Sequence, residues 1–455
     1  IEVDDPASGA VIGKVPRFGR VETERAIAAA AQAMGPWAAR TGKERATVLR
    51  GYYDLIMARQ EELAALLTQE QGKPLTEARG EIAYAASFIE WFAEEAKRSY
   101  GDVIPSHAPD KRIVVLKQPI GVVAAITPWN FPAAMITRKV GPALAAGCGV
   151  VVKPATQTPF TALALGALAL EAGLPAGLLN VITGSATEIG GALTQSELVR
   201  KLSFTGSTGV GAKLYAQCAP TIKKLSLELG GTAPFIVFDD AHLDASVTGA
   251  VQSKFRNAGQ TCVCANRIYA QAGVYEAFLG KLTAATRALR VGAGDQAGTD
   301  IGPLIDEKAV DKVREHITDA TSKGARVITG GQAHALGGRF FTPTVLADVT
   351  QDMLVSQEET FGPLAPVFKF ETEDDVIQQA NATPFGLAAY FYARDLGRVW
   401  RVAERIEAGI VGVNTGLIST EVAPFGGVKA SGLGREGSRY GIEDYLELKY
   451  VCMGL

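Results

Sequence analysis

The fold is decided by residues 121–153, which read GVVAAITPWNFPAAMITRKVGPALAAGCGVVVK. An apolar run over 121–126 predicts a strand, an alanine-rich stretch over 133–146 predicts a helix, and residues 149–152 predict a second strand. The alternation continues downstream, with strands expected at 178–182 and 199–204 and helices at 159–172 and 210–219. Because strands that alternate with helices form parallel sheets, this stretch predicts an α/β fold.

The flanking segments extend this fold on both sides. Toward the N-terminus, apolar residues at three- and four-residue spacing predict helices over 22–40, 44–71 and 75–98, and a β-branched run predicts a strand over 111–117. Toward the C-terminus, the alternation resumes with a strand at 234–238 and helices at 243–256 and 274–289. A chain of 455 residues, at about 150 residues per domain, has room for roughly three domains.

The composition excludes several classes of function. Hydrophobic residues make up 47% and charged residues 20% of the chain, which is typical of folded globular proteins. The formal net charge of −3 gives no excess of positive charge for nucleic acid. The longest apolar stretch, 160–170, is shorter than the about 20 residues of a membrane span. Five cysteines fit a reducing compartment, so we expect a cytoplasmic protein; we also expect residues upstream of Ile1.

Two local motifs suggest chemistry on their own. Residues 204–211, FTGSTGVG, could bring backbone close to a phosphate at a helix N-terminus, although a plain strand-to-helix turn explains them equally well. Residues 257–264, NAGQTCVC, place two cysteines at a spacing that does not fit zinc, and no histidine pair accompanies them. We therefore predict no metal site. A single cysteine is more often buried and inert than nucleophilic, so further context is needed.

That context comes from six short motifs in a fixed order. They are PWNFP (128–132), KP (153–154), LELGG (227–231), GQTC (259–262), ETFGP (359–363) and PFGG (424–427). Together they resemble the aldehyde dehydrogenase superfamily over essentially the whole chain. The resemblance implies a Rossmann-like dinucleotide-binding domain (1–98 and 119–227), an α/β catalytic domain (228–436) and a small β oligomerisation flap (99–118 and 437–455). Exposed strands of such a flap usually pair with another subunit, so we expect a homodimer or homotetramer.

By this resemblance Cys262 is the catalytic nucleophile. Its thiolate would attack the aldehyde carbon to give a thiohemiacetal, and the thioester left after hydride transfer would be hydrolysed. Asn130 and the backbone N–H of Cys262 would stabilise the oxyanion. Glu228 matches the general base, and its apolar neighbours Leu227 and Leu229 would raise its pKa. Its presence favours hydrolysis over transfer to coenzyme A. The alternatives are a turn role for Asn130 and an ion-paired strand role for Glu228.

The resemblance also assigns cofactor contacts. It gives Lys153 to the adenosine ribose region, Gly206 and Ser207 to the pyrophosphate turn, and Glu359 to the nicotinamide ribose. Trp129, Glu228, Gly230 and Phe361 complete the expected cofactor site. NAD-using relatives commonly have glutamate at the position of Thr156, where it would repel a 2′-phosphate. We therefore predict a preference for NADP, with NAD as a possible second cofactor.

Three polar residues fall where relatives that act on apolar aldehydes have aromatic side chains. They are Arg138, Arg256 and Ser419, a set that resembles the succinate-semialdehyde dehydrogenase branch. Two cations there predict an anionic substrate, which we expect to be succinate semialdehyde. Glutarate semialdehyde, one methylene longer, and a broader range of aldehydes are the alternatives. A structural role for Arg138, paired with a carboxylate on its helix face, also stays open.

The pair Cys262 and Cys264 suggests a redox switch. Some members of this branch form a reversible disulfide between the nucleophile and such a neighbour, and a ring this small would be strained and readily reduced. A role for Cys264 as a small buried residue is equally compatible with the sequence. A catalytically silent homologue and a Cys/His hydrolase are the alternatives for the whole chain. The intact catalytic residues disfavour the first, and no histidine has a motif that fits the second.

Overall fold

Residues 121–153 lie at the centre of a six-stranded sheet in the computed structural model, which describes residues 1–455. The sheet order is β17-β9-β8-β5-β6-β7. In that order the strands span Gly432–Leu433, Lys224–Glu228, Val199–Thr205, Val122–Ile126, Val150–Lys153 and Leu179–Val181. Strands β5 to β9 pair in parallel, as predicted, whereas the short edge strand β17 is antiparallel to β9.

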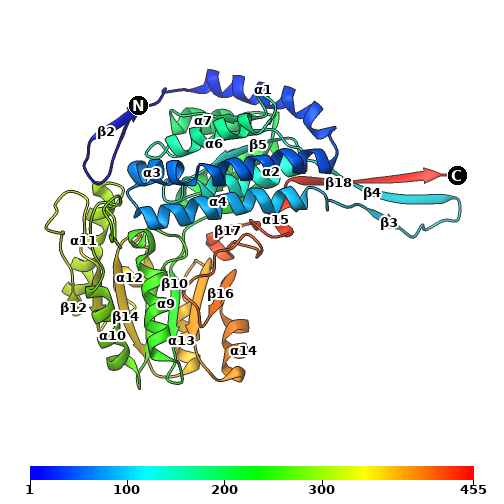
Figure 1. Ribbon diagram of the computed structural model, residues 1–455. Helices are drawn as coiled ribbons and strands as arrows, with labels where there is room; N and C mark the ends of the chain where they lie inside the picture. Colours follow the sequence, from blue (N-terminus) through cyan, green and yellow to red (C-terminus); the bar gives the residue numbers. More distant parts are fainter.

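Helices cover both faces of this sheet because successive side chains of β5 point to opposite sides. Val122 and Ala124 join one core, and Val123 and Ala125 join the other. The first core includes α1 (Arg20–Ala38), α7 (Ala186–Gln195) and α8 (Thr208–Cys218). The second includes α2 (Gly42–Ala58), α3 (Gln60–Gln71), α4 (Leu75–Glu95), α5 (Ala134–Ala146) and α6 (Phe160–Glu171). Figure 1 shows α2 and α4 running side by side along this layer.

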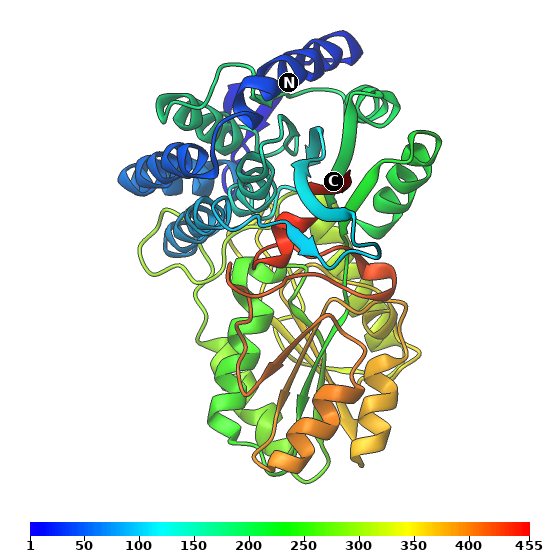
Figure 2. The same cartoon turned by 90° about the vertical axis from the view of Figure 1, so that its right-hand side faces the viewer.

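A second sheet forms the lower body in Figures 1 and 2. Its order is β12-β13-β14-β11-β10-β15-β16, and only β12 is antiparallel to its neighbour. In that order the strands span Arg326–Thr329, Thr344–Ala347, Leu364–Phe370, Ala265–Gln271, Ala233–Val237, Ala388–Tyr392 and Ile410–Val413. Its helices are α9 (Leu243–Phe255), α10 (Tyr275–Arg287), α11 (Glu307–Ser322), α12 (Leu354–Gln357), α13 (Glu373–Asn381) and α14 (Leu396–Arg405).

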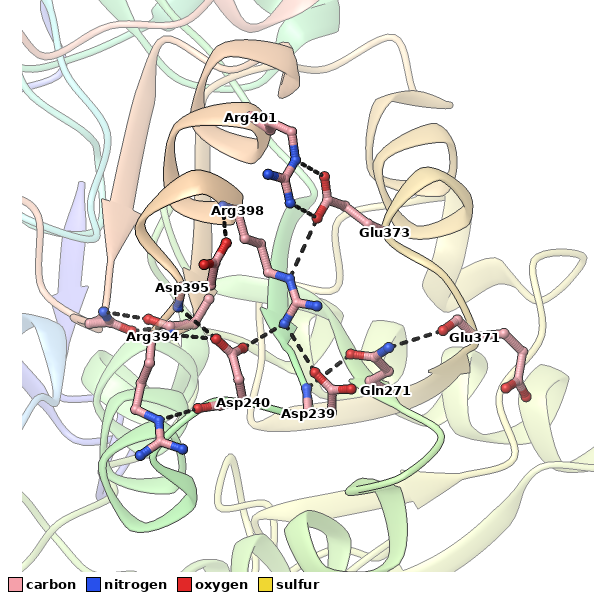
Figure 3. Close-up of polar contacts among 11 residues, drawn as sticks. Asp239, Asp240, Gln271, Glu371, Glu373, Arg394, Asp395, Arg398 and Arg401 are labelled. Carbon is pink, nitrogen blue, oxygen red and sulfur yellow. Dashed lines mark hydrogen bonds and ion pairs between the residues drawn. The ribbon is translucent and has the colours of Figure 1, made fainter.

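A cluster of charged residues fastens α14 to this second body (Figure 3). Arg398 lies over the ring of Phe238 and pairs with Asp239 (3.0 Å), Asp240 (2.6 Å) and Glu373 (3.5 Å). The other carboxylate oxygen of Asp240 accepts the backbone N–H groups of residues 394 and 395. One guanidinium therefore joins the ends of β10, α13 and α14.

A three-stranded antiparallel sheet projects away from both bodies (Figure 1). It consists of β18 (Leu446–Gly454), β4 (Lys111–Pro119) and β3 (Asp102–Ile104), with β4 in the middle. Large apolar side chains on it are exposed, among them Val103 at 82% and Leu448 at 68%.

The remaining short elements are β1 (Glu2–Asp4), β2 (Val11–Lys14), α15 (Tyr440–Glu443) and the 3-10 turns Ala219–Thr221, Arg256–Gly259 and Lys429–Ser431.

The structure differs from the sequence predictions in a few local features. The single helix expected over 44–71 is wrong, because Arg59 (φ −105°, ψ 20°) leaves helical geometry and separates α2 from α3. The apolar spacing continues across Arg59, so the pattern gave no sign of the break. Helix α7 was not predicted, and neither were strand β11 and the elements from α11 to β16 in the second body. None of the helices has the length and apolar character needed to cross a membrane.

Candidate active site

The candidate site lies where the strand order of the first sheet reverses. The chain runs from β5 outward to β6 and β7 on one side, and returns to β8 and β9 on the other. In α/β sheets, ligands bind in the crevice at the carboxyl ends of the strands next to such a point. Trp129 and Asn130 follow β5, and Gly206 and Ser207 follow β8 and precede α8. The sequence-predicted residues of both segments are thus brought to one crevice.

Two cavities meet at Cys262. One, of about 250 Å³, is lined by Pro128, Trp129, Asn130, Met135, Thr205, Gly206, Ser207, Glu228, Leu229, Gly230, Cys262, Glu359 and Phe361. The other, of about 290 Å³, is lined by Glu77, Gly80, Glu81, Tyr84, Phe131, Met135, Arg138, Arg256, Thr261, Cys262, Val263, Ser419 and Phe425. We call them the dinucleotide cavity and the aldehyde cavity. Only Cys262 and Met135 line both, so the thiol stands between them.

An unusual backbone turn presents Cys262 at this junction. Asn257 (φ 52°), Ala258 (φ 54°) and Gly259 (φ 77°) form a left-handed run after α9. A Cβ on Gly259 would lie 2.1 Å from the backbone oxygen of Gly362, so only glycine fits there. Beyond Cys262, the hydroxyl of Tyr390 donates a 2.8 Å hydrogen bond to the carbonyl of Val263. The loop is therefore fixed on both sides of the thiol.

Asn130 is tied to the same loop. Its side-chain amide donates to the backbone oxygen of Gln260 at 3.1 Å, and its own backbone oxygen accepts from Lys73 Nζ (2.7 Å) and from the Asn257 amide (2.9 Å). Lys73 is fully buried and pairs with Glu81 at 2.5 Å. Sequence reasoning missed Lys73, in the connection between α3 and α4, and Glu81, in α4, because nothing in the neighbouring sequence marks either residue as buried.

Burial sets the protonation of the two catalytic candidates. Burial, and then the nearby Glu359 carboxyl, raise the pKa of the Cys262 thiol to about 12, while the Arg138 guanidinium acts in the opposite direction. Glu228 is 3% exposed, and neither carboxyl oxygen has a hydrogen-bond partner. Burial and then the Glu436 carboxylate raise the pKa of Glu228 well above its usual value, which is what a general base requires.

The dinucleotide cavity has features that fit a nicotinamide cofactor. Burial raises the pKa of Glu359 to about 8, and only the N–H of Gly231 approaches its carboxyl, at 3.5 Å, so acceptor positions are left for ribose hydroxyls. A Cβ on Gly230 would lie 2.8 Å from that carboxyl, so glycine keeps the space open. Phe361 contacts Trp129 edge to face at 5.6 Å. Lys153 lies at the end of β6, bonded to the carbonyl of its neighbour Pro154, and neither it nor Thr156 lines this cavity.

The aldehyde cavity brings Arg138, Arg256 and Ser419 together, although they are far apart in sequence. Arg138 Nε lies 2.7 Å from Glu436, and its guanidinium stacks on Phe425 at 4.1 Å. Arg138 is therefore paired with a carboxylate, as the alternative expects. Its Nη2, however, has no hydrogen-bond partner. Arg256 stacks on Phe131 at 5.3 Å.

Three further polar residues at the site were not predicted. Tyr84 and Glu77 of α4 line the aldehyde cavity, and Lys139 of α5 pairs with Glu436 behind it. Cys264, by contrast, is buried and lines neither cavity; its thiol lies 3.5 Å from the backbone oxygen of Lys254.

Comparisons with known proteins agree with this geometry. The family model described as "Aldehyde dehydrogenase family" matches residues 1–451. The NADP(+) succinate-semialdehyde dehydrogenase of Escherichia coli is 67% identical over 100% of this chain and 94% of its own length, and the glutarate-semialdehyde dehydrogenase of Pseudomonas aeruginosa has the same identity and coverage. A crystal structure titled as an E. coli NADP-dependent enzyme superposes with a TM-score of 0.99 at 67% identity, covering 100% of this chain and 95% of that one. The chain belongs to the aldehyde dehydrogenase family and has its fold.

Proposed function

We propose that this protein oxidises succinate semialdehyde to succinate, with NADP as the preferred cofactor. One observation carries the proposal: Cys262 stands between a cavity lined by two arginines and a cavity built at the strand-order reversal for a dinucleotide. The E. coli relative at 67% identity, named as NADP(+)-dependent, supports both the substrate and the cofactor. Thr156 supports the same cofactor. A glutamate at this position would repel a 2′-phosphate, whereas the uncharged threonine does not.

The reaction starts with the thiolate of Cys262. It adds to the aldehyde carbon, and the side-chain amide of Asn130 with the N–H of Cys262 stabilises the oxyanion that develops. Because the thiol's pKa is raised to about 12, the thiol needs a base to take its proton and the positive charge of Arg138 nearby to stabilise the thiolate. Glu228 is the base in this proposal, and it releases the proton to solvent before the hydrolysis step. When bound, the nicotinamide supplies the hydride acceptor that converts this adduct into a thioester.

Hydrolysis then releases the acid. Glu228 takes a proton from water, the hydroxide oxygen adds to the thioester carbon, and the carbon–sulfur bond breaks to give the carboxylate product and the Cys262 thiolate. Neither oxygen of Glu228 is engaged by the protein, so both are free to accept that proton. The overall balance is one aldehyde, one water and one oxidised cofactor consumed, with one carboxylate, one reduced cofactor and two protons formed, the first taken from water by Glu228 and the second lost as the acid ionises.

Arg256 and Arg138 are proposed to hold the distal carboxylate of the substrate. A second substrate, glutarate semialdehyde, has a specific argument in its favour, since a relative with that name is also 67% identical to this chain. One methylene is worth only about 1–3 kcal/mol of discrimination in a pocket, so both substrates fit the proposal of an arginine clamp.

The test is a matrix of initial rates, followed by absorbance of the reduced nicotinamide. Succinate semialdehyde, glutarate semialdehyde and propanal are each measured with NADP and NAD. We expect succinate semialdehyde with NADP to have the highest kcat/KM. A higher kcat/KM for glutarate semialdehyde than for succinate semialdehyde selects the second candidate. The highest kcat/KM for propanal would mean that the two arginines have a structural role only. A hundredfold higher kcat/KM with NAD than with NADP contradicts the role of Thr156. No turnover with any pair identifies a catalytically silent homologue.

Four further expectations belong to the same proposal. We propose that the projecting sheet of β3, β4 and β18 pairs with another subunit in a homodimer or homotetramer, because it carries exposed apolar side chains such as Leu448. The domain limits at residues 98, 118, 227 and 436, the cytosolic location and the disulfide between Cys262 and Cys264 stay predictions. Reversible inactivation by peroxide that is lost in Cys264→Ala would support the disulfide.

A further inference from the structure

Helix α11 holds the segment that carries two side chains of the dinucleotide cavity. Glu359 and Phe361 line that cavity, and the residue between them, Thr360, is bonded to the helix behind: its hydroxyl lies 3.0 Å from His316 Nδ1. Glu358, the residue before Glu359, pairs through its carboxylate with Lys312. His316 and Lys312 are four residues apart and so share one face of α11.

The same face of α11 fixes the two ends of the segment. Asp319 accepts the backbone N–H of Leu354 at 2.7 Å, where α12 begins. At the other end, a Cβ on Gly362 would lie 2.4 Å from a methyl group of Val313, so the backbone approaches the helix closely. The helix therefore supports the segment from residue 354 to residue 362.

His316 is a fully buried polar residue on this face. It is 0% exposed, and its Nε2 lies 3.5 Å from Glu358. Burial and the charge of Lys312 lower the pKa of His316, so the imidazole is neutral at pH 7 and shares one hydrogen bond with Thr360.

Thr360 links this support to the nucleophile loop. Its backbone N–H donates to Asn266 Oδ1 at 3.3 Å, and the amide of Asn266 donates to the carbonyl of Cys264 (3.3 Å) and of Gly231 (3.4 Å). The next residue, Phe361, has a φ of 53°, a left-handed conformation that is costly for an aromatic residue. Such conformations persist only where the surroundings fix them, and the two bonds of Thr360 do so here.

We propose that His316, through its hydrogen bond to Thr360, is a positioning residue that places Glu359 and Phe361 for the nicotinamide end of the cofactor. His316 itself lines neither cavity, so it acts only through the segment. The inference rests on the proposed function, because it takes the cavity next to Cys262 as the cofactor site.

Binding of NADP⁺ measured by titration calorimetry tests this without relying on turnover. Thr360→Val removes the hydroxyl at nearly constant shape, and His316→Gln removes the nitrogen near the Nδ1 position. We expect each to raise the Kd for NADP⁺ about tenfold, which corresponds to about 1.4 kcal/mol, with the KM for the semialdehyde within about twofold of wild type. His316→Asn, which keeps a polar atom near Nδ1, should restore most of the affinity.

Two comparisons separate positioning from general loss of stability. The double variant Thr360→Val with His316→Gln should bind no more weakly than either single variant, because both break the same bond. Asp311→Asn, which removes an exposed ion pair to Arg314 on the same helix, is the matched control and should leave the Kd unchanged.

The outcomes are distinct. Wild-type affinity in Thr360→Val and His316→Gln overturns the inference, as does full additivity of the two. If His316→Gln fails to fold, Thr360→Val alone decides. A wild-type protein that does not bind NADP⁺ contradicts the proposed function instead.

Discussion

Replacing Arg256 by leucine is the most direct test of the arginine clamp. Arg256 lines the aldehyde cavity and stacks on Phe131, and it forms no ion pair with a carboxylate. Glu77, which lines the same cavity, keeps its 2.8 Å hydrogen bond from the N–H of Asn257. Arg256→Leu therefore removes one positive charge from the cavity without leaving a paired carboxylate buried.

The expected magnitude follows from the bond that is lost. A hydrogen bond to a charged group contributes about 1.5–3 kcal/mol, and about 1.4 kcal/mol corresponds to a factor of ten. We therefore expect kcat/KM for succinate semialdehyde to fall about 10- to 150-fold. Most of the loss should appear in KM, since the distal carboxylate is bound equally in the ground state and in the transition state. Propanal, which has no carboxylate, should lose less than about twofold.

Arg138→Leu is the informative comparison. Arg138 pairs with the buried Glu436, which would be left with Lys139, and its charge lowers the pKa of Cys262 and of Glu228. This variant should therefore lose activity on propanal as well, and its Tm should fall.

The assay is the initial rate of cofactor reduction with each substrate at saturating NADP. Equal losses on propanal and on succinate semialdehyde in Arg256→Leu would refute the clamp, because a clamp acts only on the anionic substrate. Unchanged kinetics on the semialdehyde would refute it equally.

Three other changes have clear expected outcomes. Glu228→Gln should leave a single burst of reduced cofactor but lower steady-state turnover by about 10²–10⁴-fold. In wild type, kcat should rise with pH as a carboxyl titrates well above 4.5, and this rise should disappear in the variant; an unchanged pH profile would contradict the base assignment. Gly259→Ala should lower kcat at least about 100-fold, since its Cβ would lie 2.1 Å from a backbone oxygen and must displace the nucleophile loop; retained activity would show that the loop tolerates movement. Arg398→Met should lower the free energy of unfolding, measured by urea titration, by about 1.5–3 kcal/mol. Because the residues of the cluster in Figure 3 line neither cavity, kcat/KM should stay unchanged; a change in kinetics with no loss of stability would contradict this.

Local patterns in the sequence predicted the α/β class and most elements of the first body, and the motifs indicated the family. The apolar run of β5 and the alanine-rich α5 have periodicities that depend only on neighbouring residues, so the α/β class and the parallel sheets could be predicted. The motifs around Asn130, Glu228 and Cys262 indicated the family before any contact was known. The helix break at Arg59 could not be seen, because the apolar spacing continues through it.

Which of these residues meet, and in what charge state, depends on contacts made in the folded chain. Lys73 lies 57 positions from Asn130, and Lys139 lies 297 positions from Glu436, yet each pair is in contact inside the protein. Arg138 both lines the aldehyde cavity and pairs with Glu436, a double role that spacing does not reveal. Burial and contacts between distant segments depend on how helices, strands and loops pack in the folded chain, and a local pattern contains no information about that packing.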